Sequence, residues 1–173
     1  MYTDTNIVTA PNCSLIVGDN AKPTLFLAGG ISNCGDWQAE MIRMLFSRMR
    51  EGTSMPDDGW VLLNPRRASY QDTPENARRQ IEWEYAHLAV ADAVLFWFPK
   101  ETLCPITLLE LGRWSGVAKP LFIGIDPDDA RRLDVEVQIN LARPYVRPVY
   151  SLDDLAELVL KETPEIARLK YGR

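Results

Sequence analysis

Two glutamates, Glu110 and Glu84, stand where a carboxylate could do chemistry. Glu110 follows the apolar run 92–98 and the helix-starting Pro105, so it falls within the first two turns of a predicted helix. The dipole of that helix favours an ionised carboxylate, and an ionised carboxylate can act as a nucleophile. The alternative is a helix-start acid that only stabilises its helix.

Glu84 belongs to a second predicted helix, at about residues 75–90. The apolar face of that helix, projected at about 100° per residue, consists of Ala77, Ile81, Tyr85 and Leu88. Glu84 falls within this face and Glu82 well off it. A glutamate turned toward the core is costly unless it is paired or functional, so we expect Glu84 to act as an acid or base. The alternative is an ion pair with one of three arginines: Arg66, Arg67 or Arg113.

Two carboxylates at the carboxyl edge of a parallel sheet suit the cleavage of a glycosidic bond. One attacks the anomeric carbon, and the other exchanges a proton with the leaving group. The single histidine, His87, is expected to be a surface or helix-pairing residue. A Ser-His-Asp triad or a histidine metal site is therefore not expected.

Two polar loops follow predicted strands. Gly29 and Gly30 allow a ligand to approach the backbone, although they match neither a dinucleotide fingerprint nor a P-loop. A tight strand–helix turn explains them equally well. Arg66 and Arg67 follow Asn64 and could bind a phosphate or carboxylate, or orient a catalytic acid. A solvated charged loop is the alternative.

The elements that must position these residues alternate along the chain. Strands are expected at 24–28, 60–64, 92–98, 120–125 and 146–150, with a further candidate at 14–17. Helices are expected at 36–51, 75–90, 106–117 and 133–142, and from Ser151 onward. This alternation predicts an α/β fold: a doubly wound, mostly parallel five-stranded sheet with helices on both faces, flavodoxin-like or Rossmann-like, with a possible extra N-terminal strand. Ligands bind such sheets beyond the carboxyl ends of the strands.

Composition narrows the class of protein. A net charge of −5 argues against general binding to nucleic acid or to a membrane surface. The longest apolar runs have strand length, and no signal peptide is visible. The three cysteines, Cys13, Cys34 and Cys104, suggest neither a disulfide framework nor a zinc site. We expect a flexible arm over residues 1–12 and a single domain over 13–173, in the cytoplasm and without a cofactor.

Three stretches together resemble the nucleoside 2-deoxyribosyltransferase family: Phe26-Leu-Ala-Gly-Gly30, Asp92-Ala-Val-Leu-Phe-Trp97 and Leu109-Glu-Leu-Gly112. The branch with Asn-Pro-Arg-Arg and Trp-Glu motifs is the most similar, over about residues 24–155. The resemblance implies that Glu110 forms a covalent deoxyribosyl intermediate after the first base leaves, and that a second base then attacks the sugar. It places Glu84 where the family carries an aspartate that handles protonation of the base.

The resemblance also implies contacts with the substrate. Asp36 and Gln38 fall in the loop that closes over the base, and Asn140 or Asp134 matches an asparagine that a neighbouring subunit supplies to the sugar. The expected substrate-binding residues are Gly29, Gly30, Ser32, Asp36, Gln38, Asn64, Arg66, Arg67, Asp92 and Asn140. The expected partners are a nucleoside or nucleotide, a free nucleobase, and further copies of the chain that share active sites.

Two positions depart from the family pattern. Phe26 stands where the family has a tyrosine that positions the nucleophile, and Cys104 where an aspartate usually precedes it. Several alternatives therefore stay open. One is hydrolysis of a nucleoside or nucleotide, with Ser32, Arg66 or Arg67 meeting a phosphate. Another is a nucleotide-binding module without turnover. A third is a flavodoxin-like redox or signalling domain, although the first loop lacks a cradle rich in serine and threonine.

Overall fold

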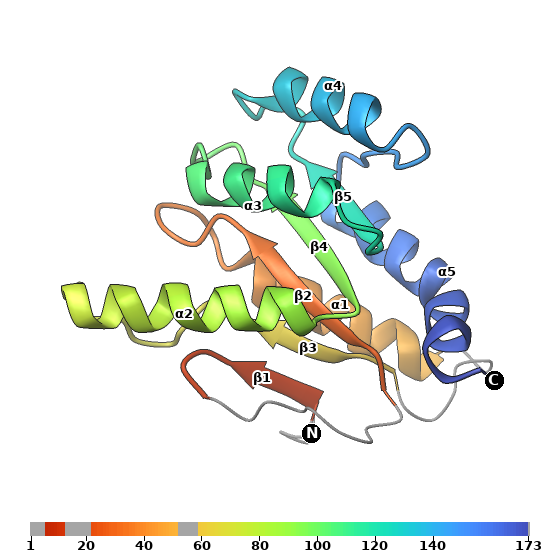
Figure 1. Ribbon diagram of the computed structural model, residues 1–173, viewed down its shortest axis with the longest axis horizontal. Helices are drawn as coiled ribbons and strands as arrows, with labels where there is room; N and C mark the ends of the chain where they lie inside the picture. The colour runs from red at the N-terminus through yellow and green to blue at the C-terminus, as the bar shows by residue number, and fades with distance from the viewer. Residues whose placement is uncertain (1–5, 13–21, 52–58, 173) are drawn as a thin grey trace.

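Five parallel strands form one sheet in the order β1-β3-β2-β4-β5 (Figure 1). This computed structural model describes residues 6–12, 22–51 and 59–172. The strands are β1 (Ile7–Thr9), β2 (Thr24–Gly29), β3 (Val61–Asn64), β4 (Ala93–Phe98) and β5 (Leu121–Ile125). The predicted doubly wound α/β fold is confirmed.

Helices cover both faces of the sheet (Figure 1). They are α1 (Trp37–Glu51), α2 (Pro74–Val90), α3 (Pro105–Ser115), α4 (Arg132–Ala142) and α5 (Leu152–Tyr171). One core cluster joins the sheet to α2, α3 and α4, and the other joins it to α1 and α5. None of the helices within the described residues has both the length and the apolar character that a membrane span requires.

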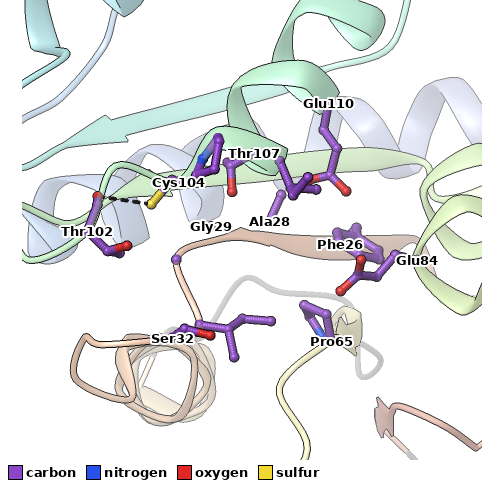
Figure 2. A pocket seen from close by; sticks show the side chains of 14 residues that line it. Phe26, Ala28, Gly29, Ser32, Pro65, Glu84, Thr102, Cys104, Thr107 and Glu110 are labelled. Atoms are coloured by element: carbon purple, nitrogen blue, oxygen red, sulfur yellow. Dashed lines mark hydrogen bonds between the residues drawn. The ribbon is translucent and has the colours of Figure 1, made fainter. Parts of the chain in front are cut away.

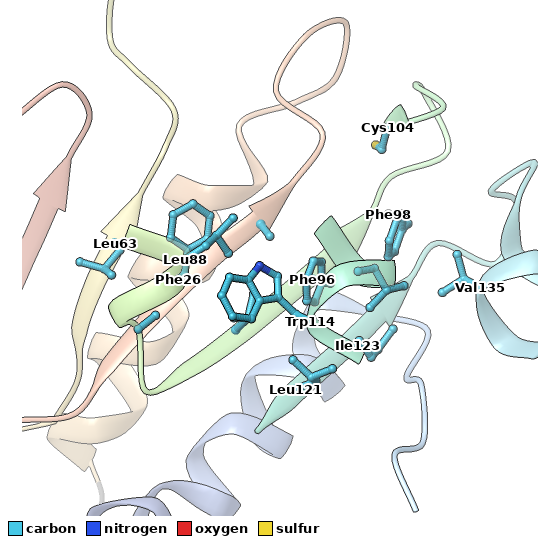
Figure 3. Packing of buried hydrophobic residues seen from close by; sticks show 14 of the residues in the cluster. Phe26, Leu63, Leu88, Phe96, Phe98, Cys104, Trp114, Leu121, Ile123 and Val135 are labelled. Carbon is cyan, nitrogen blue, oxygen red and sulfur yellow. The ribbon is translucent and has the colours of Figure 1, made fainter. Parts of the chain in front are cut away.

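The central strand β4 explains why the sequence there is almost wholly apolar. Each of its residues is buried, because a strand between two helical layers has no solvent face. Phe96 and Phe98 join the cluster under α3, where Trp114 also packs (Figure 3), while Leu95 and Trp97 join the opposite cluster. The strand thus runs through the core and ends just before Pro99.

The ends of two helices follow predicted capping rules. Thr73 accepts a hydrogen bond from the backbone N–H of Asn76 at 3.2 Å, and Pro74 occupies the first turn of α2. Ser151 caps α5 in the same way, accepting from the N–H of Asp154 at 3.0 Å. These caps set where the helices begin and therefore which residues of α2 face the sheet.

Two expectations about the strands were wrong. Residues 7–9, placed by the sequence in a flexible arm, form the edge strand β1 beside β3, whereas the candidate strand at 14–17 lies outside the described residues. Residues 146–150 form a single bridge, in which Val149 N donates to Ile123 O and Ile125 N donates to Val149 O, both at 2.9 Å. Ser151 then caps α5, which begins at Leu152, so the chain leaves the sheet directly after this bridge.

Candidate active site

A cavity of about 340 Å³ lies beyond the carboxyl ends of β2, β3 and β4. After β2 the chain runs to α1 on one face of the sheet, and after β4 it runs to α3 on the other. The cavity therefore occupies the switch point of the strand order, where doubly wound sheets bind ligands. Its volume suits a small molecule.

Glu84 and Glu110 both line this cavity. Glu84 comes from α2 and Glu110 from α3, and Figure 2 shows the two side chains near Phe26 of β2. The structure thus brings together the two acids that the sequence singled out. They share the cavity with Gly29, Gly30 and Ser32 of the loop after β2.

Glu110 is not the readily ionised acid that the sequence predicted. Burial and, as the smaller cause, the negative charge of Glu84 together raise its pKa to about 8. Glu110 lies in the second turn of α3, whereas the field of a helix terminus acts mainly on the first turn. Desolvation therefore outweighs the dipole and favours the protonated form of Glu110 at neutral pH.

Glu84 experiences opposing influences. Burial raises its pKa, while a hydrogen bond from Gln80 Nε2 to Glu84 Oε1, at 2.8 Å, and the positive charge of Arg67 lower it. Of the two acids, Glu84 is therefore the one whose negative charge is stabilised by neighbours, Gln80 and Arg67. When the environments of two acids give them different pKa values, one acid can hold a proton while the other is ionised.

The inward face of α2 differs from the predicted one. Its buried residues are Trp83, His87 and Leu88. Ile81 and Tyr85, predicted to be apolar core residues, are 63% and 57% exposed. Glu84 still faces inward because it adjoins Trp83 and lies one turn after the half-buried Gln80. The predicted direction of Glu84 was therefore right, and Leu88 is buried as predicted, but the predicted apolar face was wrong at Ile81 and Tyr85.

His87 was expected to be a surface or helix-pairing residue, and it is buried. Its Nδ1 lies 2.7 Å from Trp83 O, and its ring stacks on the indole of Trp83 with centroids 3.9 Å apart. Burial lowers the pKa of His87. The residue is therefore a neutral packing element.

Packing requires glycine at both positions of the first loop. A Cβ on Gly29 would lie 2.4 Å from the Trp37 ring and 2.5 Å from Trp97 O. A Cβ on Gly30 would lie 2.8 Å from Thr102 Cγ2 and 3.0 Å from Cys104 Sγ. The tight-turn interpretation therefore holds, and both glycines also form part of the cavity wall.

Arg66 organises the loop after β2. Its guanidinium donates to Gln38 Oε1 at 2.8 Å, to Gly35 O at 3.0 Å and to Gly30 O at 3.3 Å. It also pairs with Asp36 at 3.4 Å. Asp36 in turn accepts from the backbone N–H of Ala39 at the start of α1. Arg66, Asp36 and the fully buried Gln38 thus brace the loop from behind, outside the described wall of the cavity.

The other expected binding residues lie elsewhere. Asn64 Oδ1 accepts from the backbone N–H of Arg66 at 3.0 Å. Asp92 accepts from Thr24 and from Lys170 at the amino end of β4, opposite the cavity. Asn140, on α4, accepts from Arg147 at 3.2 Å. The structure of one chain does not bring these three residues to the cavity wall that it describes.

Sequence reasoning missed Thr107 and did not expect Cys104 in the wall. Thr107 is buried and lines the cavity one turn before Glu110, so its spacing from the glutamate was the available signal. Cys104 begins α3 in the left-handed conformation, with φ 48°. Burial raises the pKa of its thiol to about 12, so a neutral group stands where the sequence comparison led us to expect a carboxylate. Among the described residues, no three side chains of His, Cys, Asp or Glu gather closely enough to hold a metal ion.

Comparison with known proteins identifies a family. A search of curated proteins found nothing similar to the chain. A family model described as nucleoside 2-deoxyribosyltransferase like matches residues 22–128. This span contains β2 to β5 and both cavity glutamates. The chain therefore belongs to the nucleoside 2-deoxyribosyltransferase-like family, as the resemblance in its sequence predicted.

Proposed function

We propose that the protein cleaves the N-glycosidic bond of a (deoxy)nucleoside and transfers the sugar to another nucleobase. The main support is that Glu84 and Glu110 line one cavity. Gln80 and Arg67 stabilise the negative charge of Glu84, while burial favours the protonated form of Glu110. Family membership supports nucleoside glycosyl transfer in general. The covalent step and the order of events below are inferred from the chemistry of the pair.

The reaction uses one proton shared by the two glutamates. Glu110 first passes its proton to Glu84, whose anion is stabilised by Gln80 and Arg67. A Glu110 oxygen then bonds to the anomeric carbon while the C–N bond breaks and its electron pair stays on the base. Glu84 protonates the departing base. In the second half, an incoming base attacks the anomeric carbon, Glu84 takes its proton and Glu110 leaves.

The cavity wall favours an uncharged nucleoside over a nucleotide. Of the described residues that line it, the charged ones are Glu84 and Glu110. The guanidinium of Arg66 is engaged by the loop after β2, and that of Arg67 lies over the ring of Tyr70. A 5′-phosphate would thus enter a cavity whose described wall carries two acids and no cation, so deoxynucleosides should react faster than their monophosphates.

Hydrolysis is the second candidate, and Ile106 favours it. This residue lines the cavity and is 60% exposed, so the rim is open to solvent in a single chain. Water can then compete with a base for the covalent intermediate. The product would be a free base and a free sugar.

A panel assay separates the candidates. The protein is incubated with deoxynucleosides, ribonucleosides and monophosphates, with and without a second free base, and the products are resolved by chromatography. A new nucleoside identifies transfer, and free base alone identifies hydrolysis. If no glycosidic bond is broken on any substrate, or if Glu110→Gln retains full activity, the proposed function is wrong.

We also propose that copies of the chain assemble around the cavity. Large apolar side chains project from the outer surfaces of α2 and α3: Ile81, Tyr85, Ile106 and Leu109. Burying such residues against a second copy would be favourable and would close the open rim beside Ile106. Light scattering should give an oligomer, and Leu109→Glu should weaken it. A monomer that turns over at the wild-type rate contradicts a shared site.

A further inference from the structure

Two nitrogen atoms of the Arg67 guanidinium are buried and, within the described part of the chain, unpaired. Its Nε and Nη2 are shielded from solvent and have no hydrogen-bond acceptor among the described residues. The guanidinium lies over the ring of Tyr70, 5.5 Å from the ring centre. Burying cationic donors without acceptors is costly, so this arrangement needs a compensating interaction.

A polar cluster joins Glu84, whose negative charge interacts with the positive charge of Arg67, to the loop that carries Arg67. Gln80 Nε2 donates to Glu84 Oε1 and to Pro65 O, both at 2.8 Å. This side chain thus joins α2 to the loop after β3, two residues before Arg67. The negative charge on which Arg67 acts is that of Glu84. The cluster therefore links the Asn-Pro-Arg-Arg motif to the Trp-Glu motif.

The surroundings of Glu84 set its charge from several directions. Its charged neighbours are Arg67, in the loop after β3, whose positive charge lowers its pKa, and Glu110, on α3, whose own pKa the charge of Glu84 raises. Phe26 of β2 contributes an apolar wall of the same cavity. Gln80 lies one turn earlier on the same helix, while His87, one turn later, is directed to the carbonyl of Trp83. Arg67 is the cation of this set.

We propose that Arg67 is a positioning residue that keeps Glu84 as the anionic member of the pair, ready to accept the proton of Glu110. The inference rests on the proposed function. The proton moves from Glu110 to Glu84 and then to the leaving base, while the freed Glu110 oxygen bonds to the sugar. No further reactant is needed. Arg67 thus acts through Glu84 and does not contact a substrate phosphate.

The pH profile of a charge-neutral variant tests this role. The reactive pair holds one proton, so activity falls at low pH when Glu84 is protonated as well. Arg67→Met removes the stabilising cation, raises the pKa of Glu84 and moves the acidic limb of kcat/KM to higher pH. We expect activity on a deoxynucleoside to fall roughly tenfold on the acidic limb of the profile and to stay close to wild type on its plateau. Arg67→Lys should restore the acidic limb.

A measurement on the resting protein separates this inference from the proposed function. Carbon-13 spectra of the carboxyl groups follow the titration of Glu84, assigned with Glu84→Gln. The midpoint should rise in Arg67→Met and not in Arg78→Met, which removes an exposed arginine of α2 that pairs with Glu82 at 3.9 Å. This readout applies even if no substrate turns over.

Two results would overturn the role of Arg67. One is an unmoved Glu84 midpoint in Arg67→Met. The other is an equal loss of activity at every pH, which would indicate a structural role. If the methionine variant does not fold, Arg67→Gln provides the same charge removal with a polar side chain.

Discussion

Glu84 and Glu110 reach one cavity from two different helices, and the negative charge of Glu84 raises the pKa of Glu110. Burial raises the pKa of both acids, but Gln80 and Arg67 offset part of this rise at Glu84, whereas the charge of Glu84 adds to it at Glu110. Their neighbours thus give two chemically identical carboxyl groups different tendencies to ionise. This inequality lets the pair retain a single proton across neutral pH.

Replacing Glu110 by glutamine should lower kcat by about a thousandfold or more, because the amide cannot form the ester with the sugar. Intact-mass spectrometry of the acid-quenched wild-type reaction should detect a sugar adduct, and digestion should place it on the peptide containing Glu110. The Arg78→Met variant should form the same adduct. An adduct on another residue would remove Glu110 from the nucleophile role.

Replacing Glu84 by glutamine should slow base release from an ordinary deoxynucleoside by roughly a hundredfold or more, since the base no longer receives a proton. A 7-methylated purine deoxynucleoside carries a cationic base that leaves without protonation. The variant should therefore react with this substrate at nearly the wild-type rate. Equal losses on both substrates would show that Glu84 does not act as the acid.

Stability should depend on pH through Glu110. Its pKa rises from an ordinary value of 4.5 to about 8 in the folded protein, so the folded state stays protonated to a higher pH than the unfolded state. The stabilisation is complete below pH 4.5 and is lost as pH rises through about 8. Glu110→Gln removes this loss, so its melting temperature should exceed that of the wild type by several degrees at pH 8.5 but not at pH 4.5. A difference that stays constant with pH would contradict the buried-acid assignment.

Gly30→Ala should destabilise the fold, because the new methyl group meets Thr102 Cγ2 at 2.8 Å. Thr102→Ser removes that Cγ2 atom, so the double variant should recover part of the stability measured by urea denaturation. Gly29→Ala should be more damaging, since one of its clashes is with the backbone oxygen of Trp97 at 2.5 Å. Additive effects of Gly30→Ala and Thr102→Ser would show that this contact is not limiting.

Arg66→Lys should lose most of the hydrogen bonds that Arg66 makes to the loop after β2. A lysine offers one compact group, whereas the guanidinium of Arg66 reaches Gln38, Gly30 and Gly35 together. We expect a loss of about 1–3 kcal/mol in the free energy of unfolding, with a raised KM because the loop beside the cavity loosens. A lysine variant with wild-type stability and KM would contradict the bracing role.

The sequence was informative where local rules govern the structure. Pro74 and Pro105 fix the starts of their helices, and the buried run of β4 identifies the centre of the sheet. Chain direction also carries information that our prediction for Asp92 overlooked. Asp92 precedes β4, so it lies at the amino edge of the sheet, opposite the loops that follow Gly29 and Pro99.

Long-range partners set the features that the sequence did not reveal. Trp83 is buried on α2 with its Nε1 donating to Asn12 O at 3.0 Å, from a distant part of the chain. Hydropathy along one helix cannot register such a partner, and it therefore selected Ile81 and Tyr85 instead. The pKa of Glu110 likewise depends on the depth of the cavity and on Glu84, which spacing in α3 does not encode.

The bracing of the first loop by Arg66 has a consequence for the thermodynamics of ligand binding. The carbonyl oxygens of Gly30 and Gly35 accept hydrogen bonds from the same guanidinium, so contacts within the protein hold both ends of the loop between them. A nucleoside entering the cavity would not have to freeze this segment, and little conformational entropy would oppose its binding. Calorimetry should therefore show a small change in heat capacity, set by the surface of the nucleoside itself and not by coupled folding of the loop.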